Sequence, residues 1–453
     1  MDSLGQMAGF AATTPSTTLS ADVMERSALI LADCIGAMVG GAAEPDVAQL
    51  SARQSGSGPA LLIGTDQRRP PGMAALLNGT AGTTLEMDEG NQFCKGHPGM
   101  HTVPAALAVA EESAVSGADL LAAIAVGYDV GARVGIATQL RPSMHPHGTW
   151  GAICAATAVA RLQGADTAKM RHAISLSASL GLSTSRRTML EGGTVRNVFA
   201  GVSGQMGVLA GDMIAAGYTG DDDGVAQVFG HVVSDRFDAA AFTADLGSRW
   251  EVSRNYFKMH SCCRYNHAAL DALASMRAAH SFDSSEVANV QVETYALAVE
   301  LNDPAPKNVL AGKFSVPFAI ATALVNGKTD VESFTMPNVE NPVIQALAKK
   351  VTVVEDPAMT AMLPHKRPAR VSVTLTDGTT LQAATETNRG DWSDPYPAME
   401  IREKYLSLTT RLWREDAAIR VWDLVMSLAD APSLAPLFSE MAHAPRDPSK
   451  VSP

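Results

Sequence analysis

The chain has 453 residues, of which 46% are hydrophobic, 18% charged and 5% aromatic. This length exceeds one ordinary hydrophobic core, so two domains are expected. The formal net charge of −12 and the pI near 5.4 argue against a nucleic-acid partner, which would require a basic face. An anionic small molecule is still compatible with this charge, because a local basic pocket can exist on an acidic protein.

The cysteines and the apolar segments indicate a cytoplasmic protein without disulfides. The five cysteines are an odd number without metal-type spacing, and adjacent Cys262 and Cys263 are poorly placed to pair. The N-terminus lacks the basic and apolar regions of a signal peptide. The most apolar run, residues 28–43, contains Asp33 and is too short to span a bilayer, so it predicts a buried helix and no membrane partner.

Hydrophobic patterning predicts helices through almost all of the first 260 residues. The predicted helices cover residues 20–39, 47–56, 73–85, 103–116, 117–139, 152–162, 167–182 and 198–216. A polar interruption occupies residues 86–99. Thr149 is the expected N-cap of the small-residue helix 152–162.

The pattern changes after His267. Strands are predicted at 287–299, 351–354, 369–375 and 379–387, the last two joined by a Thr-Asp-Gly turn, with helices at 315–326 and 343–350. Helices 398–410 and 415–428 follow, and we expect them to pack back on the first part of the chain. The predicted fold is mainly α with an inserted α+β domain. Residues 1–267 and 395–453 would build a discontinuous all-helical domain, and residues 268–394 the smaller α+β domain.

Two groups of ionisable residues flank predicted helices. The first lies in a short polar stretch and contains Asp88, Glu89, Lys95, His97 and His101. A solvated loop in which Asp88 caps a helix is the alternative interpretation.

The second group is His145-Pro146-His147, followed by Gly148. A lone histidine is usually structural, but a pair held by Pro and Gly at a helix start indicates a site. A helix N-terminus also suits an anionic ligand.

Two further groups are rich in cations. Arg186, Arg187 and Arg196 surround Gly192-Gly193, an arrangement suited to carboxylates. Surface arginines are the alternative, and for Arg187 we prefer it.

The stretch from Lys258 to His267 contains Cys262, Cys263 and Arg264, which suggests a nucleophile or an anion pocket. Cys262 is interpreted as a small core residue.

Nothing in the sequence indicates a metal or a nucleotide cofactor. His97 and His101 have helical spacing, but Pro98, Gly99 and Pro104 argue against a continuous helix there. The H-E-x-x-H, C-x-x-C, G-x-G-x-x-G and Walker patterns do not occur. The ionisable residues of these groups are histidines, arginines, lysines and a few acidic residues. Such a set fits proton transfer at the carbon next to a carboxylate, with cations holding the negative charge of the substrate.

Seven segments spread over most of the chain resemble motifs of one family. They are Ala32-Asp33-Cys34-Ile35-Gly36; Asn78-Gly79 with Leu85-Glu86-Met87-Asp88-Glu89; His97-Pro98-Gly99 with Val103-Pro104-Ala105; His145-Pro146-His147-Gly148-Thr149-Trp150-Gly151; Ala216-Gly217-Tyr218-Thr219-Gly220; Lys258 with Cys262-Cys263-Arg264-Tyr265-Asn266-His267; and Lys313-Phe314-Ser315-Val316-Pro317. On these motifs the chain resembles the MmgE/PrpD family, which includes 2-methylcitrate dehydratase, cis-aconitate decarboxylase and iminodisuccinate epimerase.

The resemblance implies a helical domain built from both chain ends, an α+β lid, an active site between them and a homodimer. It also implies that no metal or organic cofactor is used. By position, Asp88, His97, His145 and Lys258 match active-site residues of family members.

Several positions depart from the family pattern. Arg196 stands where members often have lysine, Phe199 and Thr83 where they have histidine, and Cys263 where cis-aconitate decarboxylase has histidine. These differences concern the substrate and leave the expected fold untouched.

The function expected on these grounds is a lyase acting on a small di- or tricarboxylate, either 2-methylcitrate dehydratase-like or cis-aconitate decarboxylase-like. The expected catalytic residues are His97, His145, Asp88 and Lys258. One of the two histidines would abstract or return the proton at carbon, Asp88 would orient that histidine or stabilise its charge, and Lys258 would hold a carboxylate together with Arg196 and Arg264. Substrate binding is expected from six side chains: Arg196, Arg264, His101, His147, Cys263 and His267. The alternatives are a dicarboxylate epimerase, which needs a proton acceptor on each face of the carbon, and a non-catalytic carboxylate-binding protein.

Overall fold

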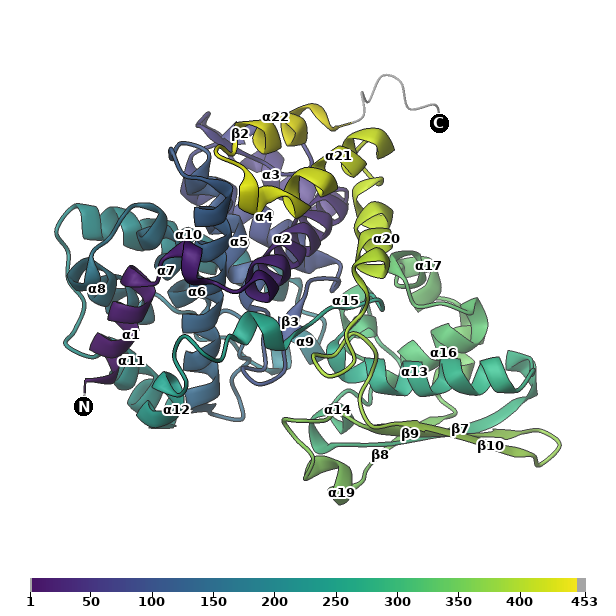
Figure 1. Cartoon of the computed structure of the whole chain (residues 1–453). Coiled ribbons are helices and arrows are strands. Elements are labelled where there is room, and N and C mark those ends of the chain that lie inside the picture. Colours follow the sequence, from purple (N-terminus) through teal and green to yellow (C-terminus); the bar gives the residue numbers. More distant parts are fainter. Residues whose placement is uncertain (1, 446–453) are drawn as a thin grey trace.

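The computed structural model describes residues 2–445 of the chain. It is mostly helical, with one small mixed sheet set to one side of the helices (Figure 1). The sheet is the only one with more than two strands among the described residues. The mainly α character predicted from the sequence is therefore confirmed.

Most of the helices precede residue 280. They are α1 (Ser3–Thr13), α2 (Ala21–Ala42), α3 (Pro45–Arg53), α4 (Pro71–Thr84), α5 (Pro98–Ala110), α6 (Gly117–Ala137), α7 (Gly151–Leu162), α8 (Thr167–Ala178), α9 (Arg187–Leu190), α10 (Phe199–Ala215), α11 (Gly224–Gln227), α12 (Ala239–Thr243) and α13 (Arg264–Ala279). Small residues let these helices approach closely. A Cβ added to Gly207 of α10 would lie 2.2 Å from the Cβ of Ala155 on α7, so only glycine fits this crossing.

Short strand pairs tie the loops of this helical part together. They are β1 (Ala60–Leu61) with β2 (Arg68–Arg69), β3 (Gly90–Asn91) with β6 (Asn255–Tyr256), and β4 (Thr138–Leu140) with β5 (Ser234–Phe237). The β3–β6 pair matters for the site, because it joins the polar segment after α4 to the segment that leads into α13.

The larger sheet has the strand order β10-β9-β7-β8. Its strands are β7 (Val287–Thr294), β8 (Val351–Glu355), β9 (Ala369–Leu375) and β10 (Thr380–Thr385). β7 runs parallel to β8 and antiparallel to β9, and β9 and β10 form the hairpin that the sequence predicted. The accompanying helices are α14 (Ala296–Val299), α15 (Val309–Lys313), α16 (Val316–Asn326), α17 (Met336–Val339), α18 (Pro342–Ala348) and α19 (Pro357–Thr360).

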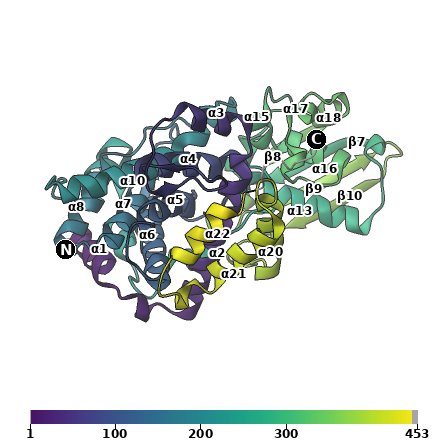
Figure 2. The ribbon, with the colours of Figure 1, turned by 90° about the horizontal axis from the view of Figure 1, so that it is seen from above.

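Buried apolar side chains form two main clusters. The larger runs from Leu4 to Ala444 and so combines residues from both ends of the chain, whereas the smaller extends from Met189 to Val373. The last helices, α20 (Ala398–Thr409), α21 (Glu415–Met426) and α22 (Ala435–His443), belong to the larger cluster. Helices α20 and α21 pack against α2 (Figure 2), and α22 packs against α21. The boundaries at residues 267 and 394 stay predictions.

Local predictions near the site need correction. Helix α5 begins at Pro98, five residues earlier than expected, because proline is tolerated in the first helical turn and Pro104 is accommodated inside the helix. The expected cap Thr149 does not cap α7. Its hydroxyl donates to the Pro146 carbonyl, and Trp150 occupies the N-cap position. The strand predicted for residues 287–299 ends at Thr294, and the short helix α14 takes its second half.

Two helical segments within residues 2–445 are long and apolar enough to cross a membrane by length and composition alone. They are Gly117–Ala137 and Thr194–Ala215, and 94% of the apolar window of the first and 56% of that of the second are buried inside the protein. Burial inside the protein therefore accounts for the apolar residues of α6. It accounts for about half of the apolar window of Thr194–Ala215.

Candidate active site

A cavity with about 50 Å³ of space for water-sized molecules is lined by mostly polar and charged side chains from several distant segments. This is room for on the order of a few waters. Its wall includes six residues that carry the argument: Glu86, His97, His145, Arg196, Cys263 and Arg264. All but Glu86 were predicted as site residues, and they converge from segments far apart in the sequence.

The turn at Glu86 brings one carboxylate, that of Glu86 itself, to the cavity wall. Helix α4 ends at Thr84, and Glu86 then adopts φ 55°, the left-handed region that is unfavourable for a residue with a Cβ. The surrounding contacts hold it there: its carboxylate forms ion pairs with Arg196 and with Lys258, the latter at 3.3 Å. Burial raises the pKa of Glu86, but these cations outweigh it and keep the pKa below its usual value.

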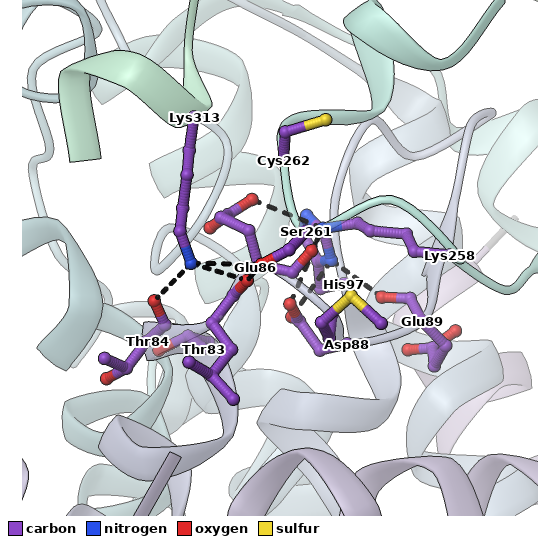
Figure 3. Close-up of polar contacts among 12 residues, drawn as sticks. Thr83, Thr84, Glu86, Asp88, Glu89, His97, Lys258, Ser261, Cys262 and Lys313 are labelled. Atoms are coloured by element: carbon purple, nitrogen blue, oxygen red, sulfur yellow. Dashed lines mark hydrogen bonds and ion pairs between the residues drawn. The ribbon is translucent and has the colours of Figure 1, made fainter. Parts of the chain in front are cut away.

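The buried Asp88 and the partly buried His97 form a pair beside this turn (Figure 3). Nδ1 of His97 lies 3.0 Å from Oδ2 of Asp88 and 2.7 Å from the carbonyl oxygen of Glu89. Because both neighbours are acceptors, the geometry assigns the Nδ1 proton to this imidazole. Nε2 is then the nitrogen that can take up and release a proton at the cavity.

Lys258 completes the set around Asp88. Its Nζ lies 3.6 Å from Oδ1 of Asp88, and the lysine is fully buried. Burial raises the pKa of Asp88, yet His97 and Lys258 together hold that pKa well below its usual range. Burial lowers the pKa of Lys258, but Glu86 and Asp88 outweigh it and hold that pKa above its usual value. Asp88 is therefore a carboxylate and Lys258 an ammonium at neutral pH.

His145 has the opposite hydrogen-bonding pattern to His97. Its Nδ1 accepts a hydrogen bond of 3.0 Å from the backbone N–H of His147, so the neutral ring carries its proton on Nε2. Burial and the nearby Arg196 hold the pKa of His145 well below its usual value. At neutral pH this side chain is thus an uncharged hydrogen-bond donor.

The remaining predicted histidines lie away from the cavity wall. His101 and His147 are fully buried with ring centroids 4.7 Å apart, and burial lowers the pKa of His101 to about 3. His267 packs against His260, and its Nε2 lies 3.2 Å from the carbonyl oxygen of Cys262. Substrate contact by these three residues stays a prediction.

The cations of the cavity wall fall into two sets. Arg264 lies 3.0 Å from Asp391, Arg186 lies 2.6 Å from Glu300, and Arg196 is paired with Glu86. Two further wall residues, Lys95 and Arg367, form no ion pair with any residue between 2 and 445. Arg367 is only 4% exposed and donates to the carbonyl oxygen of Gln92 at 3.2 Å.

Sequence reasoning did not select Glu86 or Arg367. Glu86 stands in the same acidic run as Asp88, so its signal was present but indistinguishable from that of a solvated loop. Arg367 lies in a basic Pro-His-Lys-Arg-Pro stretch far from every other site residue, and only the fold brings it to the cavity. Within residues 2–445, no group of three or more His, Cys, Asp or Glu side chains is arranged to hold a metal ion.

Two family models match the chain. The MmgE/PrpD N-terminal domain matches residues 5–238, and the MmgE/PrpD C-terminal domain matches residues 260–429.

Curated relatives are similar along most of their length. A cis-aconitate decarboxylase of Aspergillus terreus is 24% identical over 461 residues, covering 94% of this chain and 93% of the relative. The cis-aconitate decarboxylases of Homo sapiens and Mus musculus are each 23% identical, covering 85% and 81% of this chain and 82% and 77% of those proteins. The chain belongs to the MmgE/PrpD family.

Proposed function

We propose that this protein is a cofactor-independent lyase that decarboxylates a small tri- or dicarboxylate of the cis-aconitate type. The observation that carries the proposal is the Asp88–His97 pair, whose geometry leaves one imidazole nitrogen free to exchange a proton at the cavity. The names of the relatives support decarboxylation as the first reaction to test.

In this reaction a C–C bond of the substrate breaks and carbon dioxide leaves. The electron pair stays on the remaining carbon chain, where an adjacent carboxylate bound by Arg196 and Arg264 spreads the negative charge. His97 in its protonated form then delivers the Nε2 proton to carbon, and it recovers a proton from water. The carboxylate of Asp88 stabilises the imidazolium and keeps the ring in the required orientation.

The charge of the cavity supports a substrate with more than one carboxylate. Lys95 and Arg367 carry positive charges that no acidic side chain of the described chain compensates at ion-pair distance. Two carboxylates on the substrate would balance them. His145, as a neutral donor, would add a hydrogen bond to a carboxylate or carbonyl oxygen.

Dehydration is the second candidate, since the same His97 in its neutral form can remove a proton from carbon. Epimerisation finds less support, because it needs a second proton acceptor. Nδ1 of neutral His145 is occupied and its Nε2 carries the proton, so this ring has no free acceptor. A non-catalytic carboxylate-binding protein would have no use for the Asp88–His97 pair.

Proton NMR in D2O on cis-aconitate and 2-methylcitrate tests the proposal. We expect the wild type to convert cis-aconitate to a dicarboxylate that carries one deuterium on carbon. His97→Gln should lower the rate by roughly 10²- to 10⁴-fold.

The matched control is His260→Gln, because His260 is also paired with an aspartate, Asp271 at 3.1 Å, but does not line the cavity. Loss of water from 2-methylcitrate instead would establish the dehydratase. Unchanged substrates with wild-type enzyme would refute the proposal for these compounds.

Cytoplasmic location and a homodimer are included in this proposal as predictions from the sequence.

A further inference from the structure

The C-terminal end of α4 is bound by donors from several distant segments (Figure 3). Nζ of Lys313 lies 2.8 Å from the carbonyl oxygen of Leu85 and 3.4 Å from that of Thr84. The hydroxyl of Ser261 donates to the same Leu85 oxygen at 2.6 Å. Lys258 donates to the carbonyl oxygen of Glu86 at 3.2 Å. These carbonyls lack partners within the helix, and cations are favourable at this end of the helix dipole.

Lys313 differs from the other cations in this cluster. Arg196 and Lys258 form ion pairs with Glu86, whereas Lys313 forms none with the described residues. Its three acceptors are two backbone carbonyls and the hydroxyl of Ser261, at 3.2 Å. The residue is 2% exposed, and burial lowers the pKa of its ammonium to about 8.

The titratable groups that influence Lys313 electrostatically come from three neighbouring segments: Glu86, Glu44, Cys262 and Lys258. Glu86 and Glu44 favour its charge, but neither is within ion-pair distance. A buried lysine without a carboxylate partner is costly, so its hydrogen bonds to α4 are the structural reason for its charge.

Lys313 also binds a second segment of the cavity wall. Its own carbonyl accepts a hydrogen bond of 2.9 Å from the backbone N–H of Cys263 and one of 3.0 Å from Asn266 Nδ2. Cys263 precedes Arg264 at the start of α13, and both line the cavity. One residue at the end of α15 therefore joins the Glu86 turn to the segment that carries Arg264.

We propose that Lys313 is a positioning residue: by holding the carbonyls of Thr84 and Leu85, it fixes the left-handed turn at Glu86 and so sets Glu86 and Asp88 against Lys258 and His97. Without Lys313 the turn has only Ser261 to hold the Leu85 carbonyl, and the strained Glu86 backbone relaxes. Two measurements test this proposal. The measurement of kcat rests on the proposed function, whereas the measurement of hydrogen–deuterium exchange does not.

The test compares Lys313→Met and Lys313→Arg with Lys350→Met. Lys350 is a matched control, because it also donates to a backbone carbonyl, that of Val287 at 2.7 Å, in the α+β part but away from α4. Hydrogen–deuterium exchange of the segment 84–90 should rise by roughly 10- to 100-fold in Lys313→Met, the factor expected for losing a hydrogen bond to a charged group. Lys313→Arg, which keeps the charge, should restore most of the protection.

With cis-aconitate as substrate, kcat of Lys313→Met should fall by about 100-fold while KM changes little, since a misplaced catalytic group costs rate rather than affinity. Ser261→Ala should give a smaller fall in kcat and a smaller rise in exchange of residues 84–90. This variant replaces Lys313→Met in the test if Lys313→Met does not fold. Exchange of residues 84–90 within twofold of the wild type in Lys313→Met would overturn the proposal. Exchange that rises equally across the whole chain in Lys313→Met, or that rises at residues 84–90 in Lys350→Met as well, would show that Lys313 only stabilises the protein. Either result would also overturn the proposal. If the wild type leaves cis-aconitate unchanged, the proposed function fails. The hydrogen–deuterium exchange result alone then decides whether Lys313 positions the turn at Glu86.

Discussion

Asp33 on α2 and Lys404 on α20 form a buried ion pair between opposite ends of the chain, with Nζ 2.6 Å from Oδ1. The other oxygen of Asp33 accepts a hydrogen bond of 2.9 Å from the backbone N–H of Glu89, next to catalytic candidate Asp88. Lys404 donates to the carbonyl oxygen of Met87. The returning C-terminal helix thus helps to hold the segment that carries the site.

Breaking this pair should be costly. Lys404→Met leaves the carboxylate of Asp33 buried and unpaired, so we predict a loss of about 3–5 kcal/mol in the free energy of unfolding, measured by urea denaturation. The control is Lys328→Met, which removes an exposed ion pair with Asp330 and should leave the free energy of unfolding nearly unchanged. Similar losses in both variants would show that the Asp33–Lys404 pair has no special role.

Asp88 should be needed for rate more than for binding. In Asp88→Asn the amide cannot stabilise an imidazolium at His97, and we predict a fall in kcat of about 100-fold or more. Steady-state kinetics on the substrate identified by NMR measures it. Asp271→Asn disrupts another Asp–His pair, with His260, outside the cavity and should retain kcat within about threefold. A retained kcat in Asp88→Asn would remove Asp88 from the mechanism.

Arg367 should determine affinity for the polycarboxylate. Arg367→Gln removes a buried cation without an acidic partner, and losing a charge-assisted hydrogen bond to a carboxylate should raise KM by roughly 10- to 100-fold. The comparison is Arg370→Gln, because Arg370 lies on β9, paired with Glu293 at 3.0 Å, and does not line the cavity. An unchanged KM in Arg367→Gln would mean that the substrate binds elsewhere in the wall.

Glu89 should make stability depend on pH. Burial and the nearby Asp33 raise the pKa of Glu89 from 4.5 to about 8, so between these values the folded protein holds a proton that the unfolded chain has lost. Its contribution is fully present below pH 4.5 and is lost as the pH rises toward about 8. Glu89→Gln abolishes this titration, while its side-chain oxygen can still accept from Gly99, which donates at 2.7 Å in the wild type.

Urea unfolding at pH 5, 6, 7 and 8 checks the Glu89 prediction. The free energy of unfolding of the wild type should fall relative to Glu89→Gln as the pH increases. A difference that stays constant over this range would contradict a raised pKa.

The elements themselves were largely readable in the sequence. The helix 152–162 and the hairpin of β9 and β10 were predicted within a residue or two, because apolar spacing and the Thr-Asp-Gly turn are local signals. The start of α5 was missed, because Pro98 can open a helix as well as end one. No helix was predicted at α13; the sequence showed only that the residue pattern changes after His267.

The candidate site likewise has features that follow from the local sequence and features that follow only from the fold. The sequence by itself determined which residue types this protein can use, and the motifs around Asp88, His97, His145, Lys258 and Arg264 were sufficient to make these residues candidates. Only the tertiary structure decided that Nδ1 of His97 faces two acceptors, that His145 is a neutral donor, and that Arg367 reaches the same cavity. The physical reason is that tautomer, burial and charge compensation depend on neighbours distant in the chain, and no local pattern encodes which neighbours those are.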